Sequence, residues 1–367
     1  MDDVFKEYSE KNHTELPALT IIQGGGTVKR EESDRNLMYD ESNLSNYKMV
    51  RKNDFIVHLR SFEGGLEKSS LDGIISPAYH TFHSDVADSR FYYSYFRSHE
   101  FIKHKLVPHV YGIRDGRSID ITGMKTIEIP YTSMEEQRKI GDYLEFLDHL
   151  ITLHQRKCEQ TKTLKKYMLQ KMFPQDGEKV PQIRFEGFTE DWEQRKFGSL
   201  LEETRNKTTV EDEDTLLSCA IDGMYLNSEL FSHFRGSSNI GYLKIKKNDL
   251  ILSAQNLHLG NCNVNLRFEH GIISPAYKVY ELVGCNPLFM QAWVKKDSTK
   301  DFFLKASTEG ASVCRKNIVW EELYKQELPI PNIEEQIKVG EYFNSLDHLI
   351  TLHLRKQDKR KKGSKNT

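Results

Sequence analysis

Apolar residues recur at spacings of three and four in two distant parts of the chain, which predicts two long amphipathic helices. The first stripe consists of Ile140, Tyr143, Leu144, Leu147, Leu150 and Ile151. The second consists of Val339, Tyr342, Phe343, Leu346, Leu349 and Ile350. Because this spacing is typical of a coiled-coil seam, we expect each stripe to pack against another helix.

Both stripes lie in a segment that the chain contains twice. Residues 135–157 read EEQRKIGDYLEFLDHLITLHQRK and residues 334–356 read EEQIKVGEYFNSLDHLITLHLRK, with 16 of 23 positions identical at an offset of 199. Upstream, GIISPAY at 73–79 recurs at 271–277. A period near 200 residues indicates a duplicated domain, since solenoid repeats are only ~20–50 residues long. Such internal symmetry suits a nearly two-fold ligand such as duplex DNA.

Each helix is preceded by a proline and then by residues in the form of a capping box. These are Pro130 with Ser133-x-x-Glu136, and Pro331 with Asn332-x-x-Glu335. The first helix can continue to Met172 before Pro174 stops it, a length of ~58 Å at ~1.5 Å per residue. We expect the two helices to pack antiparallel, with the two domains at opposite ends and related by a pseudo-two-fold axis. The alternative is that each helix packs only on its own domain.

The segments before the helices predict mixed domains with short strands. Matching Asn-Asp turns precede apolar runs at 55–59 and 250–253, and Ile-Ile pairs lead into Ser-Pro at 76 and 274. Aromatic residues open helical segments at 91–96 and 287–293, where we expect them to form the core. The predicted fold class is therefore mixed α+β, with duplicated domains separated by two long antiparallel coiled-coil helices.

Composition excludes several classes of protein. The chain has 367 residues, is 38% hydrophobic and carries a formal net charge of −2. No run approaches ~18 apolar residues, so no membrane span is expected. The start, MDDVFKEYSEKNH, is too polar and acidic for a signal peptide. Five cysteines without a CxxC pair favour reduced thiols in the cytoplasm and no zinc site.

Two motifs resemble functional sites, one a metal site and the other a methyltransferase loop, and we reject both interpretations. His149 and His154 are five positions apart, whereas two metal ligands on one helical face need three or four, so we interpret them as polar contacts between helices or with a partner. Ser-Pro-Ala-Tyr, at 76–79 and 274–277, comes close to the S/N/D-P-P-Y/F loop of amino-group methyltransferases. The second proline is missing, and no glycine-rich cofactor loop follows a strand upstream. We interpret Ser-Pro-Ala-Tyr as a turn and packing element, and the chain as non-catalytic and without a bound metal or cofactor.

Outside the shared framework the two domains differ, at 20–47 and 216–239, so we expect them to read different DNA targets. Arginine pairs well with guanine edges, and asparagine or glutamine with adenine. The candidate DNA-binding residues are Gln23, Lys29, Arg30, Arg35, His58, Arg60, Arg114 and Arg117 in the first domain, and Arg235, Gln255, Asn256, Asn261, Arg315 and Lys316 in the second. The lysine-rich runs at 156–171 and from Arg355 onward are of a kind that usually forms solvated helix faces or tails.

Together these segments resemble the specificity subunit of type I restriction–modification systems. The resemblance rests on Trp192–Gly198 (WEQRKFG), GIISPAY in both copies, the repeated IP…EEQ…LD.LI..H.RK block, and the junction residues KMFP at 171–174 and IRF at 183–185. It implies target-recognition domains at 1–133 and 189–331, spacer helices at 134–173 and 332–360, a linker at 174–188 and a basic tail at 361–367.

The resemblance also implies partners. Each domain would read half of a split sequence in double-stranded DNA. The helices would dock two modification subunits, which bind S-adenosylmethionine and flip out adenine. Restriction subunits would complete a nuclease that uses ATP and Mg²⁺, and the specificity subunit itself would bind no cofactor. The helix stripes would include the interface residues Ile140, Tyr143, Leu147, Leu150, Ile151, Val339, Tyr342, Leu346, Leu349 and Ile350. Their exposure could also allow self-association.

Two departures from the family suggest an alternative. The opening motif at 192–198 has no counterpart in the first copy, so we expect a first domain that is short at its N-terminus. The second helix loses its apolar stripe after Leu354, so we expect a curtailed helix. The alternative function is a truncated scaffold or decoy that binds modification subunits without reading DNA.

If helix length sets the gap between the half-sites, inserting four residues after Arg156 should lengthen the helix by ~6 Å. At ~3.4 Å per base pair, the recognised gap should grow by about two base pairs. The gap can be measured by sequencing the DNA that the wild-type and lengthened chains select. An unchanged gap would contradict the ruler function of the helices.

Overall fold

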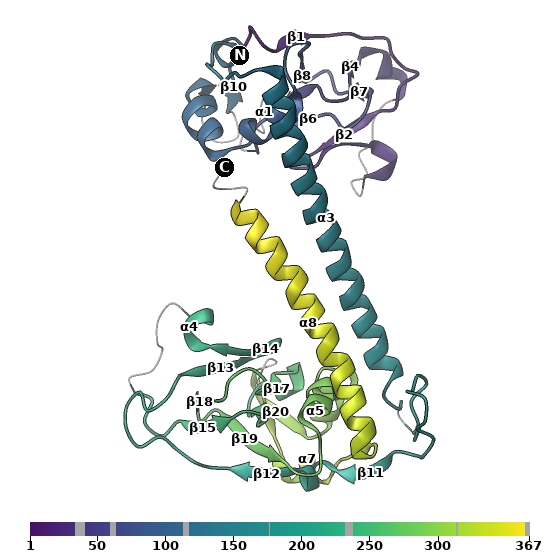
Figure 1. Ribbon diagram of the computed structural model, residues 1–367, viewed down its shortest axis with the longest axis vertical. Helices are drawn as coiled ribbons and strands as arrows, with labels where there is room; N and C mark the ends of the chain where they lie inside the picture. The colour runs from purple at the N-terminus through teal and green to yellow at the C-terminus, as the bar shows by residue number, and fades with distance from the viewer. Residues whose placement is uncertain are drawn as a thin grey trace. The chain divides into compact units, whose positions relative to one another are not determined.

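The computed structural model describes residues 1–33, 41–58, 64–112, 117–175, 177–231, 238–312 and 315–363. The chain divides into two compact units, Met1–Thr152 and Leu153–Thr367, with the boundary inside the long helix α3 (Met134–Lys171). Both units are mixed α+β, and α3 packs with the second long helix, α8 (Ile333–Gly363) (Figure 1). The predicted fold class is confirmed.

The first unit is built around a four-stranded antiparallel sheet. Its order is β1 (Lys6–Tyr8), β8 (Tyr79–His83), β5 (Phe55–His58), β6 (Glu67–Lys68). Three strand pairs accompany it: β2 (Leu19–Ile22) with β3 (Gly26–Lys29), β4 (Lys48–Val50) with β7 (Gly73–Ile75), and β9 (Val110–Tyr111) with β10 (Ser118–Ile119). The helices are α1 (Ser89–Phe96), α2 (Ile121–Lys125) and the first part of α3.

The second unit repeats this plan. Its sheet has the order β12 (Leu201–Thr204), β19 (Tyr277–Leu282), β16 (Leu250–Ser253), β17 (Cys262–Val264). The strand pairs are β13 (Leu217–Ala220) with β14 (Gly223–Leu226), β15 (Leu243–Lys246) with β18 (His270–Ile273), and β20 (Ser307–Ser312) with β21 (Arg315–Ile318). The helices are α4 (Asn227–Leu230), α5 (Pro287–Val294), α6 (Ser298–Lys305), α7 (Trp320–Lys325) and α8.

The duplication in the sequence is thus a duplication of the fold. The expected strands correspond to β5, β16, β7 and β18, and the expected helical segments to α1 and α5. The one additional pair in the second unit is β11 (Glu193–Lys196), from the opening motif, with β22 (Glu327–Ile330). The part of the first unit that the structure describes has no such pair.

The matching Asn-Asp turns enter the central strands in the same conformation. Asn53 and Asn248 have φ of 75° and 73°, a left-handed conformation that asparagine tolerates better than most residues. The following Asp54 and Asp249 are buried. In the second unit the Asp249 carboxylate accepts the backbone N–H of Lys246 at 2.8 Å, which closes the turn. The repeated residues therefore fix the start of β5 and β16.

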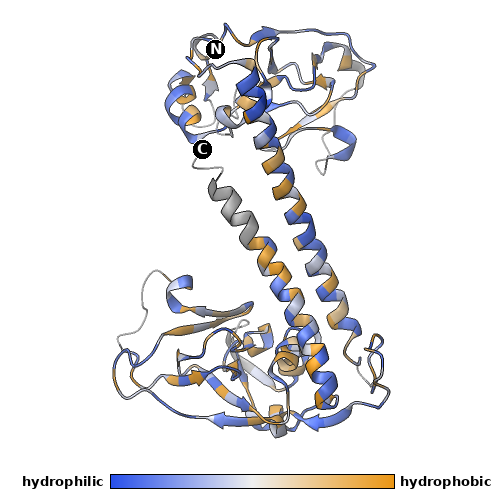
Figure 2. Ribbon diagram, viewed as in Figure 1, coloured by the Kyte–Doolittle hydropathy of each residue, from blue (hydrophilic) through white to orange (hydrophobic). Residues whose placement is uncertain are grey.

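The aromatic segments form cores, as predicted. Tyr92 and Phe96 are fully buried in the first unit, and Phe289 is fully buried in the second. Phe173, just beyond α3, packs on Phe289 with ring centroids 5.4 Å apart. The far end of α3 is therefore anchored in the core of the second unit. Both long helices alternate apolar and polar residues along their length (Figure 2).

A buried glutamine connects each long helix to its own domain. Gln137 and Gln336, from the repeated Glu-Glu-Gln, are 0% and 2% exposed. Gln137 accepts the backbone N–H of Asp88 at 3.0 Å, and Gln336 accepts that of Asn286 at 2.8 Å. Asp88 and Asn286 are the N-cap residues of α1 and α5. Each glutamine also donates to the carbonyl oxygen five positions before it, at 2.8 and 2.9 Å. We call this arrangement the glutamine clamp.

The expected capping boxes are only half formed. Glu136 N–H donates to Ser133 Oγ at 3.3 Å and Glu335 N–H to Asn332 Oδ1 at 2.9 Å, so both N-caps are confirmed. The reciprocal half was wrong, because the two carboxylates bind other groups. The carboxylate of Glu136 accepts the Thr132 hydroxyl. The carboxylate of Glu335 is 1% exposed and receives two hydrogen bonds from the Arg184 guanidinium, both at 2.8 Å.

A glycine next to each clamp lets the helices approach closely. A Cβ on Gly340 would lie 2.7 Å from both Leu288 Cβ and Phe289 N at the start of α5. A Cβ on Gly141 would lie 3.1 Å from Arg90 Cβ on α1. The glycine in the repeated block is therefore required by packing between the long helix and its domain.

Replacing Gly340 with alanine should destabilise the protein, although alanine gains ~1 kcal/mol over glycine in helix propensity. The added methyl group overlaps the backbone of α5, and overpacking of this kind costs ~1–3 kcal/mol. Urea unfolding measures the effect. Gly223→Ala is the control, because its nearest contact would be an ordinary 3.6 Å to Tyr225. A Gly340→Ala protein as stable as the wild type would contradict the close approach.

No helix in the described ranges is both long enough and apolar enough to cross a membrane.

Candidate nucleic-acid interface

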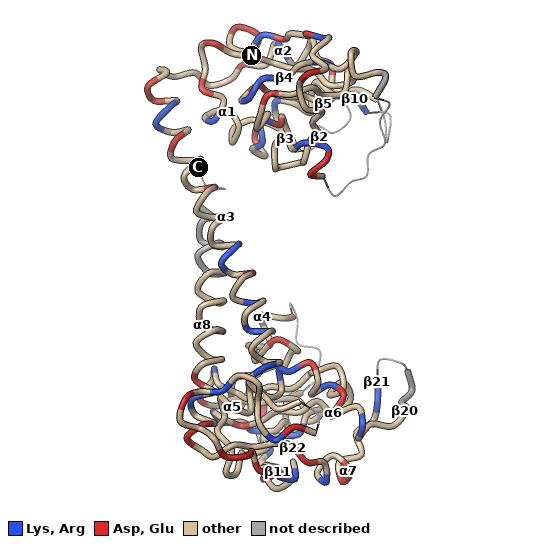
Figure 3. Tube along the Cα trace, turned by 90° about the vertical axis from the view of Figure 1, so that its right-hand side faces the viewer, with Lys and Arg blue, Asp and Glu red and all other residues tan. Residues whose placement is uncertain are grey.

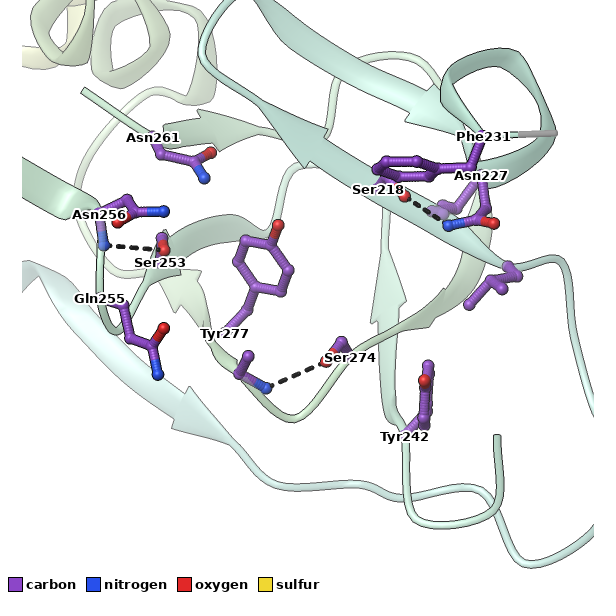
Figure 4. A pocket seen from close by; sticks show the side chains of 13 residues that line it. Ser218, Asn227, Phe231, Tyr242, Ser253, Gln255, Asn256, Asn261, Ser274 and Tyr277 are labelled. Carbon is purple, nitrogen blue, oxygen red and sulfur yellow. Dashed lines mark hydrogen bonds between the residues drawn. The ribbon is translucent and has the colours of Figure 1, made fainter. Parts of the chain in front are cut away.

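The second unit contains a polar hollow of about 340 Å³ at the ends of its strands (Figure 4). It is lined by Leu216, Leu217, Ser218, Asn227, Phe231, Tyr242, Ser253, Gln255, Asn256, Asn261, Ser274, Ala276 and Tyr277. None of these residues is charged, and four are amides. We call it the amide hollow.

Three hydrogen bonds from backbone N–H groups hold the loop that carries the amides. Asn256 N–H donates to Ser253 Oγ at 3.2 Å, immediately after β16. Asn261 N–H donates to the carbonyl oxygen of Asn256 at 3.4 Å, and the Gln255 carbonyl oxygen accepts Lys316 N–H at 3.3 Å. One loop therefore brings together three of the predicted DNA-binding residues, Gln255, Asn256 and Asn261.

Tyr277 forms the opposite wall. Its N–H donates to the Ser274 carbonyl oxygen at 3.1 Å, so Ser-Pro-Ala-Tyr is a turn, as predicted. Its hydroxyl donates to the Cys219 carbonyl oxygen at 3.0 Å, and burial raises the pKa of this phenol. The ring therefore remains neutral and fixed in position, and it presents a flat apolar surface to the hollow.

Asn261 has an open acceptor. Its side-chain Oδ1 is buried and has no hydrogen-bond partner within the described part of the chain. Buried polar atoms in folded proteins are nearly always paired, so an open one in a binding hollow suits a ligand donor. Asparagine and glutamine side chains form paired hydrogen bonds with the major-groove edge of adenine.

The first unit has a hollow of about 540 Å³ at the equivalent place. It is lined by Thr20, Ile21, Ile22, Gln23, Ser33, Ile56, His58, Gly64, Gly65, Glu67 and Tyr79. His58 ends β5 as Ser253 ends β16, and Tyr79 takes the place of Tyr277. The imidazole of His58 lies against the Tyr79 ring, with centroids 5.1 Å apart. We call this the His58 hollow.

The His58 hollow contains one charged residue, Glu67, whereas the amide hollow contains none. The Glu67 carboxylate is already paired with other groups of the protein. It accepts Gly24 N–H at 2.7 Å and the Tyr93 hydroxyl at 3.0 Å, and Arg97 lies 3.8 Å away. Gln23, His58 and the Tyr79 ring also line this hollow. The two hollows therefore share a position in the fold and differ in chemistry.

The other predicted DNA-binding residues lie outside the hollows. Lys29 pairs with Glu32 at 3.9 Å, and the Arg30 guanidinium lies over the Tyr47 ring at 5.2 Å. Arg117 is exposed, and Lys316 adjoins the amide loop through its backbone. Four further candidates fall outside the described residues, and for Arg315 only the backbone is described: Arg35, Arg60, Arg114, Arg235 and Arg315.

Sequence reasoning missed several lining residues. Tyr79 and Tyr277 were interpreted only as packing, and Ser218, Asn227 and Tyr242 were not singled out. The signal that could have found the tyrosines is the unchanged GIISPAY repeat, because it places one tyrosine at the same position of both hollows. The others depend on folding of a region that the two copies do not share.

The predicted helix stripes face more than one neighbour. Val339 and Leu346 are buried in the core of the second unit with Phe173, and the ring of Tyr342 contacts Phe185. Leu349 is 43% exposed. In the first helix Tyr143 is 60% exposed, and four residues are partly buried: Ile140, Leu147, Leu150 and Ile151. The start of α8 therefore packs on its own domain, which is the alternative to packing between the two long helices.

The second half of α3 also packs along α8 in antiparallel fashion. Lys165 Nζ lies 2.5 Å from an Asp347 carboxylate oxygen, and His154 Nδ1 lies 3.1 Å from His353 Nδ1. His154 and His353 are equivalent residues of the two copies. The prediction that His154 makes a polar contact between helices is confirmed. Among the described residues, no group of three or more His, Cys, Asp or Glu is placed to hold a metal ion.

Comparison with known proteins finds relatives by structure. No protein-family model matches the chain, and no curated protein matches it by sequence. The type I restriction–modification S subunit from M. genitalium matches with a TM-score of 0.58 and 14% identity, over 100% of this chain and 96% of that one.

Two further solved structures match less closely. The HsdS subunit from Thermoanaerobacter tengcongensis matches with a TM-score of 0.46 and 15% identity, over 99% of this chain and 93% of that one. A chain from a structure on assembly and conformational transition of the type I R-M system matches with a TM-score of 0.47 and 14% identity, over 99% and 96%.

The match to the M. genitalium S subunit defines the class of fold. The chain has the fold of a type I restriction–modification S subunit along its whole length, as its resemblance in sequence implied. At this identity the likeness concerns the fold alone, and the M. genitalium S subunit is the structure on which it rests.

Proposed function

We propose that the chain is the DNA-specificity subunit of a type I restriction–modification complex. The observation that carries this proposal is the pair of hollows at equivalent places in a duplicated fold, one rich in amides and one carrying His58. Two domains of the same fold, each with a hollow of different chemistry, suit a DNA target that consists of two different half-sites. The S-subunit fold supports the same function.

In this proposal the amide hollow reads a half-site that contains adenine. Gln255, Asn256 and Asn261 supply donors and acceptors for base edges, and the Tyr277 ring supplies an apolar wall for a thymine methyl group. The His58 hollow reads the other half with Gln23 and His58. The chain performs no chemistry. Modification subunits with S-adenosylmethionine would methylate adenine, and restriction subunits with ATP and Mg²⁺ would cleave.

Exposed apolar residues on the long helices suit the docking of modification subunits. On α3 they include Tyr143 at 60% exposed, Phe146 at 57% and Tyr167 at 50%. On α8, Leu349 is 43% exposed and Leu352 37%. Large apolar side chains that remain exposed on a helix commonly mark a protein interface.

Selection from a pool of random duplexes tests the proposal. The full chain, alone and with a modification subunit, is incubated with the pool, and the bound DNA is sequenced. Two unlike half-sites at a fixed spacing are expected. Enrichment of no sequence, with the modification subunit still bound, would contradict DNA reading and support the scaffold alternative.

Replacing Asn261 with alanine should relax the preference at one base pair of the amide-hollow half-site. Loss of a paired hydrogen bond to a base costs about 1–3 kcal/mol, or roughly 5- to 150-fold in affinity for the selected duplex. Affinity for random duplex should not change. Fluorescence anisotropy on both duplexes measures this, with exposed Asn206→Ala as the matched control. An unaltered preference in the Asn261 variant would show that this amide does not read a base.

A further inference from the structure

A second, larger hollow in the second unit is lined by lysines. It has a volume of about 840 Å³ and lies among the end of α3, α8 and the junction of α5 with α6. Its six lysines are Lys162, Lys165, Lys166, Lys171, Lys295 and Lys296, and its acidic residues are Asp222, Asp297 and Asp347. We call it the lysine groove. Figure 3 shows lysine and arginine recurring along this half of α3.

Three of the lysines form a fixed floor. Lys295 Nζ donates to the carbonyl oxygens of Ile221 and Cys262 at 2.7 and 2.9 Å, and burial lowers the pKa of this amine. Lys296 Nζ lies 4.8 Å from the centroid of the Phe173 ring. Lys165 is paired with Asp347. These contacts fix the positions of the three amines inside the groove.

We call the other three lysines the rim of the groove, and each of them has a polar partner. Lys166 is 71% exposed and lies 3.7 Å from Asp297, and Lys162 is 46% exposed and pairs with Glu159 on its own helix. Lys171 donates to Gln182. Exposed ion pairs such as those of Lys162 and Lys166 contribute little to stability, so these ammonium groups can bind an anion instead at small cost.

The groove adjoins the amide hollow. The β13–β14 hairpin connects them, because Ser218 lines the amide hollow and Asp222, at the turn, lines the groove. Because β13 ends at Ala220 and the turn follows, Ser218 and Asp222 are less than ~13 Å apart, the length of four fully extended residues. A duplex with a base edge at the amide hollow would therefore bring backbone phosphates to the groove, at ~3.4 Å per step.

We propose that the lysine groove binds the phosphate backbone of the same duplex that the amide hollow reads, and this inference rests on the proposed function. The two sites divide the work by chemistry. Lysine is a mobile point charge that binds phosphate without regard to sequence, whereas amides discriminate between base edges. An acidic protein partner would suit the charge, but the hairpin that joins the groove to the amide hollow favours duplex DNA.

The test is the salt dependence of DNA binding by the full chain. The triple variant Lys162→Gln/Lys166→Gln/Lys171→Gln removes the three rim lysines and keeps Lys165, Lys295 and Lys296. Each lost phosphate contact should lower the slope of log K against log[salt] by ~0.9, so a decrease of about two to three is expected. Affinity should fall at least about tenfold at low salt, equally for selected and random duplexes, so that the ratio between them is kept.

Matched variants control for net charge and folding. Lys139→Gln/Lys179→Gln/Lys325→Gln removes three lysines that are 74%, 68% and 66% exposed outside the groove, and it should keep the slope. A rim variant with arginine at all three positions should keep it too. Thermal melting checks that each variant is folded.

The outcomes separate this inference from the proposed function. A rim variant with the slope of the control overturns the groove as a phosphate site, even if the chain selects a two-part sequence. The same is true if the rim variant loses only an acidic protein partner. If the wild type selects no sequence but the rim variant lowers the slope on random duplex, the groove is supported and the proposed function fails.

Discussion

The glutamine clamp is the interaction on which the rest of each unit depends. A fully buried amide gains its stability only when both its oxygen and its nitrogen are paired, so the clamp tolerates little displacement of the helix. In both units it joins the long helix to the N-terminus of α1 or α5, and the adjoining glycine removes the side chain that would hold the two helices apart. Each domain is thereby fixed to its own helix by the same few atoms.

The residues that both units share form the clamp and the central sheet, whereas most of the residues that line the hollows differ. Clamp, central sheet and Asn-Asp turn occur in both units, and the Ser-Pro-Ala-Tyr turn brings one tyrosine to the same wall of each hollow. Most of the other residues that line the amide hollow come from segments whose sequence the two copies do not share. A lining can therefore change, as from Ser253 to His58, without disturbing the clamp. In the second unit, the hollow lined by amides and the groove lined by lysines both include residues of the β13–β14 hairpin.

The sequence predicted the elements better than their contacts. Periodicity located α3 and α8, and the repeat located the duplicated domain, because both signals are local or can be seen by aligning the chain with itself. The partners of Gln336 and Glu335 could not be predicted, since Asn286 and Arg184 are 50 and 151 positions away. Residue type alone singled out the amides in the loop after β16, and the structure places them together around one hollow. Tyr277 was missed because an aromatic after a turn is usually core, and only the folded hairpin shows that its ring borders a hollow.

The proposed function requires that the two units read two different DNA half-sites. The most direct test is to express the chain with a modification subunit and map methylated adenines across the host genome. The account predicts a two-part motif with different halves and a constant gap. A symmetric motif, with the same half twice, would mean that only one domain reads DNA and that the chain acts as a dimer, which would contradict the account.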